Sequence, residues 1–393
     1  MRYIAFFKVP PERLEDFVKG WTLRAQAEKV EVVLPPHTLY ESYQGVTGFV
    51  VFEVDGFRGM EAFLKRSIDA GAEVRLVPIE EDAKMSENLE KFHMAKLEAE
   101  SLWESVRYDR VGDVGVTKIL EILPLVEWRS NDEGLKVETG VSYLVKTDES
   151  CILFDLGLNS RQEDPSPLLQ NMDRLGVSLD DVDTIVISHN HGDHVGGGNW
   201  SKDKTFSVTG RQIDLGGKRV FTPVPMTYPG LKPIHSEGPT KISEGVWTIG
   251  TISNSLFRFG LTKEQSLAVN VEGKGIVLIV GCGHQTLPRI LERTEDLFEE
   301  PIYGIIGGLH YPATGGPIRI FGLYPHRLFG TGKLPWDPVT EEEVQENIGI
   351  LESRNPRLVA LSSHDSCAGS IEAFRRAFPA TYKDLSVGKR IAI

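Results

Sequence analysis

The sequence predicts an α/β protein of two domains, and three observations lead to this expectation. The chain has 393 residues, more than one ordinary domain needs. Strand-like apolar runs alternate with helix-like segments along its length. A charged, alanine-rich stretch, residues 81–110, separates an N-terminal region from a glycine-punctuated C-terminal region. We therefore expect an α+β domain over residues 1–80, a helical linker over 81–110 and a second domain over 111–393.

The first 80 residues show a strand, helix, strand, strand, helix, strand order. The alternation of apolar residues predicts strands over 4–9, 30–34, 47–55 and 72–79. Apolar residues at helical spacing predict two helices, over 11–28 and 57–71. This order is typical of ferredoxin-like domains. Because such domains commonly pair through their sheets, we also expect a homodimer.

After the linker, strands resume over residues 114–123, 139–147 and 150–157, followed by a helix near 165–175. A further strand at 184–188 runs directly into a cluster of histidines. Three later apolar strands, IVLIVGCGH (276–284), GIIGGLH (304–310) and LVALSSHDS (358–366), each end near a histidine. The carboxyl ends of strands are where open α/β sheets usually place their ligands.

Composition narrows the class of protein. The net charge of −13 disfavours nucleic acid as a partner, because that binding depends on neutralising phosphates with Lys and Arg. The longest apolar runs are too short for a membrane span, and the N-terminus meets prolines and charges too early for a secretion signal. Three cysteines far apart in sequence suit a reducing compartment. We expect a cytoplasmic protein that acts on a small molecule.

The segment TIVISHNHGDHVGGG, residues 184–198, places three histidines and an aspartate within six positions. His189 and His191 are two apart in an extended segment and can face one point together. Gly192 lets the chain turn, so that Asp193 and His194, expected at the start of the next helix, are aimed at a second point nearby. Imidazole and carboxylate suit zinc, with Mn²⁺ or Fe²⁺ as alternatives. One loop could therefore supply ligands to two adjacent divalent metal ions, whereas His37, His93 and His235 are expected to be ordinary solvated histidines.

This H-x-H-x-D-H run, with FDLG (154–157) upstream and VGG downstream, resembles the signature of the metallo-β-lactamase superfamily. The resemblance covers residues 111 to the C-terminus and implies an αββα sandwich with the metal site at one edge of its two sheets. It implies that the metal ligands of the loop are His189, His191, Asp193 and His194. Asp155 of FDLG would support this loop from behind without binding the metal.

The segments ETGVSYLV, FDLG, GCGH, YGIIGGLH and the terminal histidine segment occur in an order that resembles the dihydropteroate-synthase-like, or dihydropterin ribofuranosylaminobenzene phosphate synthase-related, subgroup. This resemblance implies that His284 is the third imidazole and His364 the last ligand. Two departures leave alternatives open. The chain reads SSHDSCAG where the subgroup has His-Cys-Gly, so the role of Cys367 is undecided. It has Cys282 where most members have a bridging Asp, so Cys282 is either a bridging thiolate or an inert buried residue.

Two metal ions that share a water lower its pKa and hold both oxygens of a hydrolytic displacement, so the expected activity is that of a metallo-hydrolase. Asp193 would then be both ligand and catalytic residue. His310 is not one of the expected metal ligands. We expect it to act as a proton donor or oxyanion contact, or else to have a structural role. Diiron electron transfer is disfavoured, because its proteins typically have glutamate at the position of His191.

The segment 311–338 is long and rich in glycine, proline and aromatic residues, which is typical of lids and pocket walls. The alternative is that its aromatic residues only attach long loops to the sandwich. The substrate-binding candidates in it are Arg319, Phe321, Tyr324, Arg327 and Trp336. A phosphoester of a fairly large organic compound is the expected substrate; lactone, thioester or β-lactam hydrolysis is the alternative, and a weakly catalytic metal-binding or regulatory module is an alternative of another class.

Overall fold

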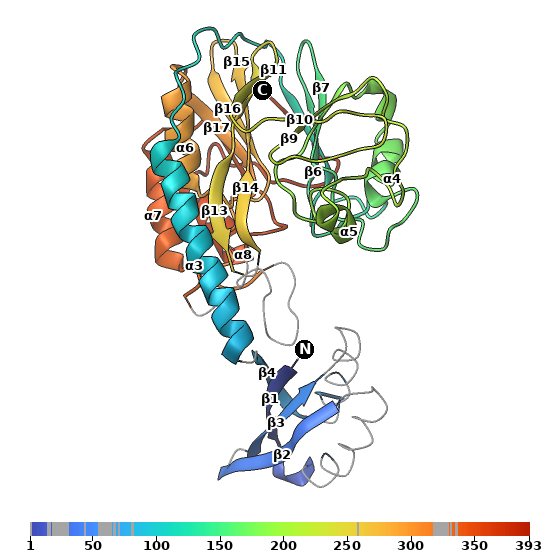
Figure 1. Cartoon of the computed structure of the whole chain (residues 1–393), viewed down its shortest axis with the longest axis vertical. Helices are drawn as coiled ribbons and strands as arrows, with labels where there is room; N and C mark the ends of the chain where they lie inside the picture. Colours follow the sequence, from blue (N-terminus) through green and yellow to red (C-terminus); the bar gives the residue numbers. More distant parts are fainter. Residues whose placement is uncertain are drawn as a thin grey trace. The chain divides into compact units, whose positions relative to one another are not determined.

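The computed structural model describes residues 2–13, 17, 31–42, 45–53, 65, 68–69, 71–79, 82–257, 259–316, 330, 332–334 and 337–393. Its contacts divide the chain into two compact units, a smaller N-terminal one and a larger C-terminal one (Figure 1). The division falls inside the helix α3 (Asp82–Ser105), after Glu90. This helix lies within the segment 81–110, for which the sequence predicts a helical linker. Within the described residues, no helix combines the length and the apolar character that a membrane span requires.

The N-terminal unit contains an antiparallel sheet in the order β2-β3-β1-β4. Ala5, Phe7 and Val9 alternate along β1 and are buried, as expected for one apolar face of a strand. The four strands lie close to the predicted segments. The two predicted helices fall largely outside the described residues, so the ferredoxin-like topology stays a prediction. The elements are β1 (Arg2–Val9), η1 (Pro11–Arg13), β2 (Glu31–Ser42), β3 (Gly45–Glu53) and β4 (Glu73–Ile79).

The C-terminal unit is a sandwich of two sheets. Among the described residues, one sheet has seven strands in the order β10-β9-β8-β7-β6-β5-β19, and β7, β8 and β9 run parallel. Its bounds are β5 (Glu121–Val126), β6 (Ser142–Lys146), β7 (Cys151–Phe154), β8 (Thr184–Val186), β9 (Arg219–Thr222), β10 (Ile234–His235) and β19 (Ile391–Ala392). The predicted strand at 114–123 is shifted, because the apolar run that the sheet buries continues to Val126.

The second sheet has six strands within the described residues, in the order β11-β12-β15-β16-β17-β18, and β16, β17 and β18 run parallel. A separate hairpin, β13-β14, extends beside it. The bounds are β11 (Pro239–Ser243), β12 (Val246–Ile249), β13 (Ile252–Leu256), β14 (Gly260–Glu264), β15 (Leu267–Val271), β16 (Gly275–Val280), β17 (Ile302–Gly307) and β18 (Leu358–Leu361).

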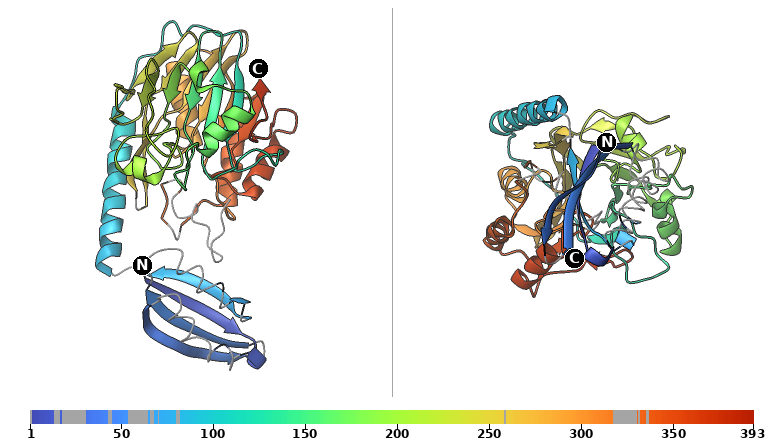
Figure 2. Two further views of the ribbon diagram at one scale, coloured as in Figure 1. Left: turned by 90° about the vertical axis from the view of Figure 1, so that its right-hand side faces the viewer. Right: turned by 90° about the horizontal axis from the view of Figure 1, so that it is seen from below.

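Alternating residues of each strand face opposite sides and so build three apolar layers. Ile152 and Phe154 of β7 pack against Val277 and Ile279 of β16 between the sheets. The residues between them face outward and are covered by helices, α4 on the first sheet and α6, α7 and α8 on the second (Figures 1 and 2). This αββα arrangement confirms the predicted fold class. The helices are α4 (Pro167–Arg174), η2 (Leu179–Asp181), α5 (Gly198–Lys202), α6 (Leu287–Leu297), α7 (Glu341–Glu352) and α8 (Ala368–Ala377).

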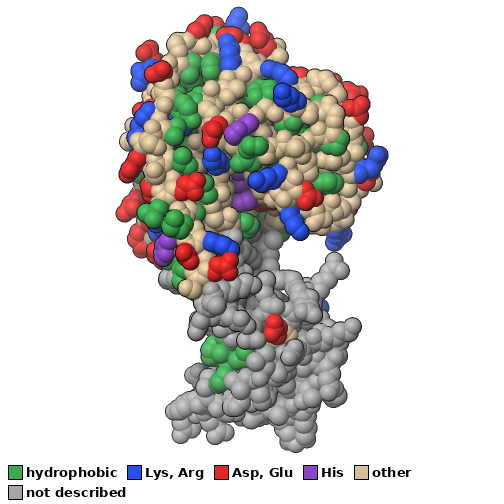
Figure 3. All heavy atoms as spheres, viewed as in Figure 1, with side chains coloured by type: hydrophobic (Ala, Val, Ile, Leu, Met, Phe, Trp, Pro, Cys, Tyr) green, Lys and Arg blue, Asp and Glu red, His purple; other side chains and the backbone are tan. Residues whose placement is uncertain are grey.

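The exposed surface of the C-terminal unit mixes Lys and Arg with Asp and Glu on the face that Figure 3 shows, and little histidine reaches that face. The predicted ligands His189, His194, His284 and His364 are instead almost completely buried. They lie where β8, β16 and β18 end, as the strand patterns predict.

Candidate metal centre

The seven predicted metal ligands come together at one edge of the sandwich. They form two groups, and in each group one ligand atom from every residue lies within 4.8 Å of those of the others. The first group is His189, His191 and His284; the second is Asp193, His194, Cys282 and His364. Groups of this size and composition can each hold one divalent ion. The loop after β8 thus contributes to both groups, and the ends of β16 and β18 complete them.

The first group consists of imidazoles only. His189 Nε2 lies 3.1 Å from His191 Nδ1, and the ring centroid of His284 lies 5.0 Å from each of the other two. Burial lowers the pKa of His189 and of His284 well below the ordinary value, and that of His191 to about 4. All three rings are therefore neutral near pH 7, which is the form that binds metals.

The second group is arranged around the Cys282 sulfur. Cys282 Sγ lies 3.0 Å from His194 Nε2 and 3.1 Å from His364 Nε2, and Asp193 Oδ2 lies 3.6 Å from His194 Nε2. Burial raises the pKa of the Cys282 thiol well above its ordinary value. The thiol would therefore lose its proton only on binding a cation, as metal-binding cysteines do.

His284 provides a direct test of whether these residues fit a metal. Its side chain is buried, and neither nitrogen of its ring forms a hydrogen bond of good geometry with a described residue, although the Gly330 backbone is near enough to raise its pKa slightly. Buried polar atoms are usually hydrogen-bonded, so two unsatisfied nitrogens on one buried ring need an explanation. A cation held with His189 and His191 supplies one. The donor set of the site thus fits a divalent metal ion.

Asp155 fixes two of the histidines from behind. It follows β7 with φ of 61°, and it accepts hydrogen bonds from the Ser188 amide (2.7 Å), the Ser188 hydroxyl (2.6 Å) and His194 Nδ1 (2.7 Å). Burial alone would lower the pKa of His194, but the carboxylates of Asp155 and Asp193 outweigh burial and raise it to about 9. Asp155 thus lies behind the loop, in the position that the resemblance implies.

Hydrogen bonds on Nδ1 leave Nε2 available in three of the histidines. The Ser188 hydroxyl lies 2.9 Å from His189 Nδ1, and the Ser362 hydroxyl lies 2.5 Å from His364 Nδ1. Since each hydroxyl donates its own proton to a carboxylate, it accepts the Nδ1 proton. Together with the Asp155 contact to His194, these bonds hold a proton on Nδ1, so that Nε2 of each ring faces the centre and can bind a metal, which on His194 would replace the second proton.

Glu127 supports His364 and was not predicted from the sequence. Its buried carboxylate accepts hydrogen bonds from the hydroxyls of Ser362, Ser363 (3.2 Å) and Tyr143 (3.2 Å). Burial raises its pKa. A charged residue inside the otherwise apolar run LPLVEW is the one signal that could have identified it.

Glu264 is a second carboxylate that sequence analysis missed. It lies at the end of β14, is fully buried, and accepts hydrogen bonds from the amides of Cys282 (2.9 Å), Gly283 (3.0 Å) and His284 (2.7 Å). Burial raises its pKa to about 7 although these amides favour the charged form. A side chain on Gly281 would collide with Ser188 Oγ at 2.2 Å, so this glycine is needed for the turn to approach the histidine loop.

His310 lies against the first group, with its ring centroid 4.8 Å from that of His284. Its backbone has φ of 51°, and its amide donates to Asp365 Oδ2 (3.0 Å). His310, Cys282 and His284 also form a compact group of donor atoms, so His310 is close enough to contact a bound substrate or a metal. Cys367, by contrast, lies at the N-terminus of α8, where its sulfur accepts from the Ser370 amide (3.4 Å).

One local expectation was wrong. Asp193 and His194 do not begin a helix; they lie in a turn, and α5 starts only at Gly198. Gly196 and Gly197 have φ of 84° and 141°, which keep the chain out of helical geometry until after them. The two side chains still face the second group.

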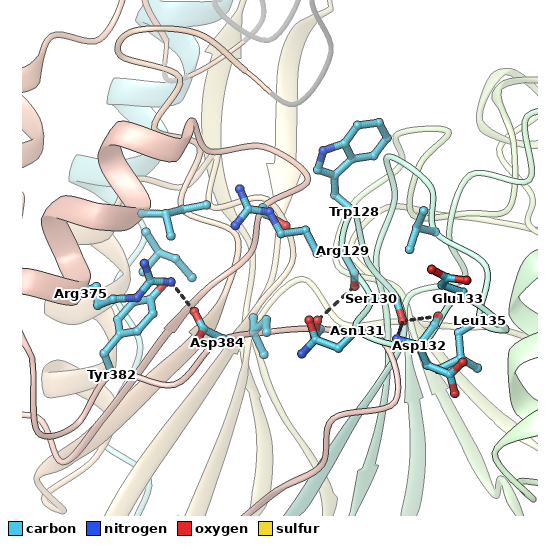
Figure 4. A pocket seen from close by; sticks show the side chains of 16 residues that line it. Trp128, Arg129, Ser130, Asn131, Asp132, Glu133, Leu135, Arg375, Tyr382 and Asp384 are labelled. Atoms are coloured by element: carbon cyan, nitrogen blue, oxygen red, sulfur yellow. Dashed lines mark hydrogen bonds and ion pairs between the residues drawn. The ribbon is translucent and has the colours of Figure 1, made fainter.

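The five predicted substrate-binding residues, Arg319, Phe321, Tyr324, Arg327 and Trp336, lie outside the described residues. A pocket of about 670 Å³ lies beside the segment that carries His364. Figure 4 shows Arg375, Tyr382 and Asp384 on one side of it and residues 130–135 on the other. Ser363, which directly precedes His364, also lines this pocket.

Comparison with protein families supports the histidine motif. Residues 135–222, which include the loop from His189 to His194, match the model of the metallo-beta-lactamase superfamily. This match agrees with the superfamily that the motif predicts for this part of the chain. Two solved structures resemble the chain: the metallo-beta-lactamase fold protein YhfI from Bacillus subtilis (TM-score 0.40, 11% identity, 70% of this chain and 100% of that one), and human tRNase Z, short form (TM-score 0.38, 13% identity, 69% and 98%).

Two curated relatives match in sequence. The 7,8-dihydropterin-6-methyl-4-(beta-D-ribofuranosyl)-aminobenzene-5'-phosphate synthase of Methanocaldococcus jannaschii is 24% identical, and the match covers 44% of this chain and 70% of that protein. The transcription termination factor FttA of Cenarchaeum symbiosum is 42% identical over 53 residues, which are 14% of this chain and only 8% of that protein. The first relative agrees with the subgroup that the sequence motifs resemble.

Proposed function

We propose that this chain, which contains a metallo-beta-lactamase superfamily domain, is a binuclear metallo-hydrolase that acts on phosphoesters of a fairly large organic compound. The superfamily fold supports a metal-dependent hydrolase and implies divalent metal ions. We propose further that two ions are bound, that they are zinc and that the substrate is a phosphoester.

The observation that carries the proposal is the pair of adjacent ligand groups, which share one loop and one edge of the sandwich. His189, His191 and His284 would hold one ion, and Asp193, His194, Cys282 and His364 the other. When bound there, two such ions would supply Lewis-acid chemistry, lowering the pKa of a water and stabilising the oxygens of a displacement at phosphorus. Cys282, between His194 and His364, takes the place of a bridging carboxylate.

The residues of the chain would divide the remaining work. The three histidines of the first group, His189, His191 and His284, have lowered pKa values, so they stay neutral and keep their lone pairs available near pH 7. Asp155, Glu127 and Glu264 fix the ligand segments, so that little reorganisation is needed during the reaction. His310, beside His284, is positioned to donate a proton to the leaving oxygen or to contact the developing negative charge.

Two findings support a phosphoester with a sizeable organic group. The Methanocaldococcus relative is named for a product that carries a phosphate on a pterin-containing compound. The pocket of about 670 Å³ beside the His364 segment is lined by Trp128 and Tyr382, which suit an aromatic group, while its charged residues are of both signs. We propose that this pocket receives part of the substrate.

Metal quantification joined to a substrate screen tests the proposal. Full-length protein is assayed with phosphomonoesters, phosphodiesters, phosphotriesters, lactones and thioesters. We expect two metal ions per chain and turnover of a phosphoester. Hydrolysis of lactones or thioesters alone would contradict the phosphoester assignment, and two bound metals without any hydrolysis would indicate a binding module.

The matched variants are His191→Ala and His235→Ala. His191→Ala should remove one metal ion and lower turnover at least about 1000-fold, because metal binding shifts the pKa of water from 15.7 to about 7. His235 lies in β10 and is in neither ligand group, so its replacement should leave metal content and turnover unchanged. Unchanged turnover in His191→Ala would reject the proposed centre.

A further inference from the structure

Arg293 on α6 is a buried cation that forms no ion pair with a described residue, although Glu292 and Asp296 of the same helix are near enough to act on it through space. Its side chain is 5% exposed, and in the described part of the chain it forms no ion pair, while its Nη1 has no hydrogen-bond partner. Its neighbours are two aromatic rings: the guanidinium carbon lies 5.2 Å from the centroid of Trp103 and 4.9 Å from that of Tyr108. Aromatic faces stabilise a cation but do not neutralise it. Buried charges are ordinarily paired, so this one suggests a missing partner.

The neighbouring Arg289, on the same helix, is a paired arginine with which Arg293 can be compared. Arg289 also stacks on Trp103, at 5.1 Å, but it forms an ion pair with Glu100 of α3. Attachment of α3 to α6 is therefore already provided by a paired cation. Arg293 has the same aromatic neighbour without the carboxylate, so attachment alone does not explain its charge.

A cavity of about 370 Å³ lies beside Arg293. Trp103, Tyr108, Glu237 and Lys263 are among the residues that line it with Arg293. Glu237 is the one carboxylate in this lining, and it is already paired with Lys263 (2.7 Å). Two cations and a single carboxylate thus line the cavity, and the carboxylate is paired with Lys263 and not with Arg293.

We propose that this cavity binds a small oxyanion, a carboxylate or a phosphate group, through the guanidinium of Arg293 with help from Lys263. Arginine presents a planar fork of donors that matches both groups. The aromatic rings hold the fork in place, so little side-chain entropy is lost when the anion binds.

The proposed anion site is separate from the metal centre. Lys263 lines the cavity, whereas the next residue, Glu264, accepts hydrogen bonds from the Cys282–His284 turn. Successive residues of a strand point to opposite faces, so β14 stands between the two sites. An anion bound at one site is therefore distinguishable from an anion bound at the other by the variants that abolish it.

Isothermal titration of the full-length, metal-loaded protein with inorganic phosphate, sulfate and acetate at constant ionic strength tests this proposal. We expect saturable binding of at least one of them. Phosphate and sulfate binding would assign a phosphate-type ligand, and acetate binding alone a carboxylate. Arg293→Met should weaken this binding about tenfold or more, as expected for the loss of a charge-assisted hydrogen bond. The matched control Arg289→Met should retain it.

Glu237→Gln should change the anion affinity in the opposite direction. Removing this carboxylate frees Lys263, so anion affinity should increase, a result that misfolding cannot produce. If Arg293→Met does not fold, Arg293→Lys, which keeps the charge but loses the fork, should also weaken binding. The absence of saturable binding, equal affinity in the Arg293 variant and the wild type, or no gain in Glu237→Gln would each overturn the proposal.

Discussion

At the scale of single residues, Cys282 is the most informative member of the candidate centre. Its sulfur lies about equally far from Nε2 of His194 and of His364, at 3.0 and 3.1 Å. The sequence alone left it open whether this cysteine is a ligand or inert. Its place among the imidazoles favours the ligand, because an inert buried cysteine would be expected among apolar neighbours.

Replacing the native metal with Co²⁺ should reveal this ligand directly. If Cys282 binds as a thiolate, the cobalt-loaded protein should show a sulfur-to-cobalt charge-transfer band in its absorption spectrum. Cys282→Ser should abolish the band, and Cys367→Ser, which changes only the cap of α8, should keep it. A band that survives in Cys282→Ser would remove this residue from the centre.

The raised pKa of His194 predicts how stability depends on pH. Its value of about 9 in the folded protein exceeds the ordinary 6.5, so between these values the folded state holds a proton that the unfolded chain has lost. The stabilisation is therefore fully present below pH 6.5 and is lost as the pH rises through about 9. The Tm of the metal-free protein should fall between about pH 7 and 9.

Asp155→Asn removes the main partner of the protonated ring and should flatten this alkaline fall, whatever its effect on the Tm itself. The metal-loaded protein should also show a smaller fall, since a metal ion replaces the proton on His194. Thermal unfolding followed by circular dichroism measures all three slopes. A metal-free protein whose Tm is constant over this range would contradict the assigned pairing.

At the scale of elements, each ligand segment is held by a carboxylate from another strand end. Asp155 holds the loop after β8, Glu264 the turn after β16 and Glu127 the segment after β18.

The ligand residues could be predicted because they follow apolar strands in a recognisable spacing. Glu264 and Glu127 could not, because they act across 18 to 20 and 235 to 236 positions of sequence, and only the folded sheets bring them to their targets.

Glu264→Gln tests this supporting role. The NH₂ group of the glutamine would face backbone N–H groups whose hydrogen bonds the carboxylate now accepts. Because two donors cannot bond to each other, the Cys282–His284 turn should shift. We expect metal affinity to fall about 10- to 100-fold, the usual effect of losing a residue that orients metal ligands. A competition assay with a chromogenic chelator measures it, with Glu272→Gln, an exposed residue in the turn before β16, as the control. Equal affinity in both variants would show that Glu264 does not position the ligands.

At the scale of the whole molecule, apolar alternation predicts individual strands and helices, whereas the αββα sandwich was predictable only through the family that the H-x-H-x-D-H run and FDLG resemble. The boundary between the two units was less predictable from the sequence. The structure places it inside α3, after Glu90, and the rest of that helix belongs to the larger unit, where Phe92 packs against Phe257 and its carbonyl accepts from Ser255. Sequence composition shows a linking helix but not which domain buries it.

Deletion of residues 1–80 should therefore leave the metal centre intact, because the part of α3 after Glu90 keeps its contacts with the larger unit. We expect unchanged metal content and turnover, within about twofold, and loss of any dimer that the N-terminal sheet forms. Size-exclusion chromatography with light scattering, joined to the assay, measures both. A truncated chain that keeps its oligomeric state and loses its turnover would place the N-terminal unit in the catalytic machinery.

The central claim is that imidazole, carboxylate and thiol groups from three strand ends hold two divalent ions side by side. Anomalous X-ray scattering at the zinc edge, from crystals of the zinc-loaded protein, tests this most directly. We predict two peaks, one among His189, His191 and His284 and the other among Asp193, His194, Cys282 and His364. Crystals with no peak among these residues, or with zinc bound only elsewhere, would contradict the account.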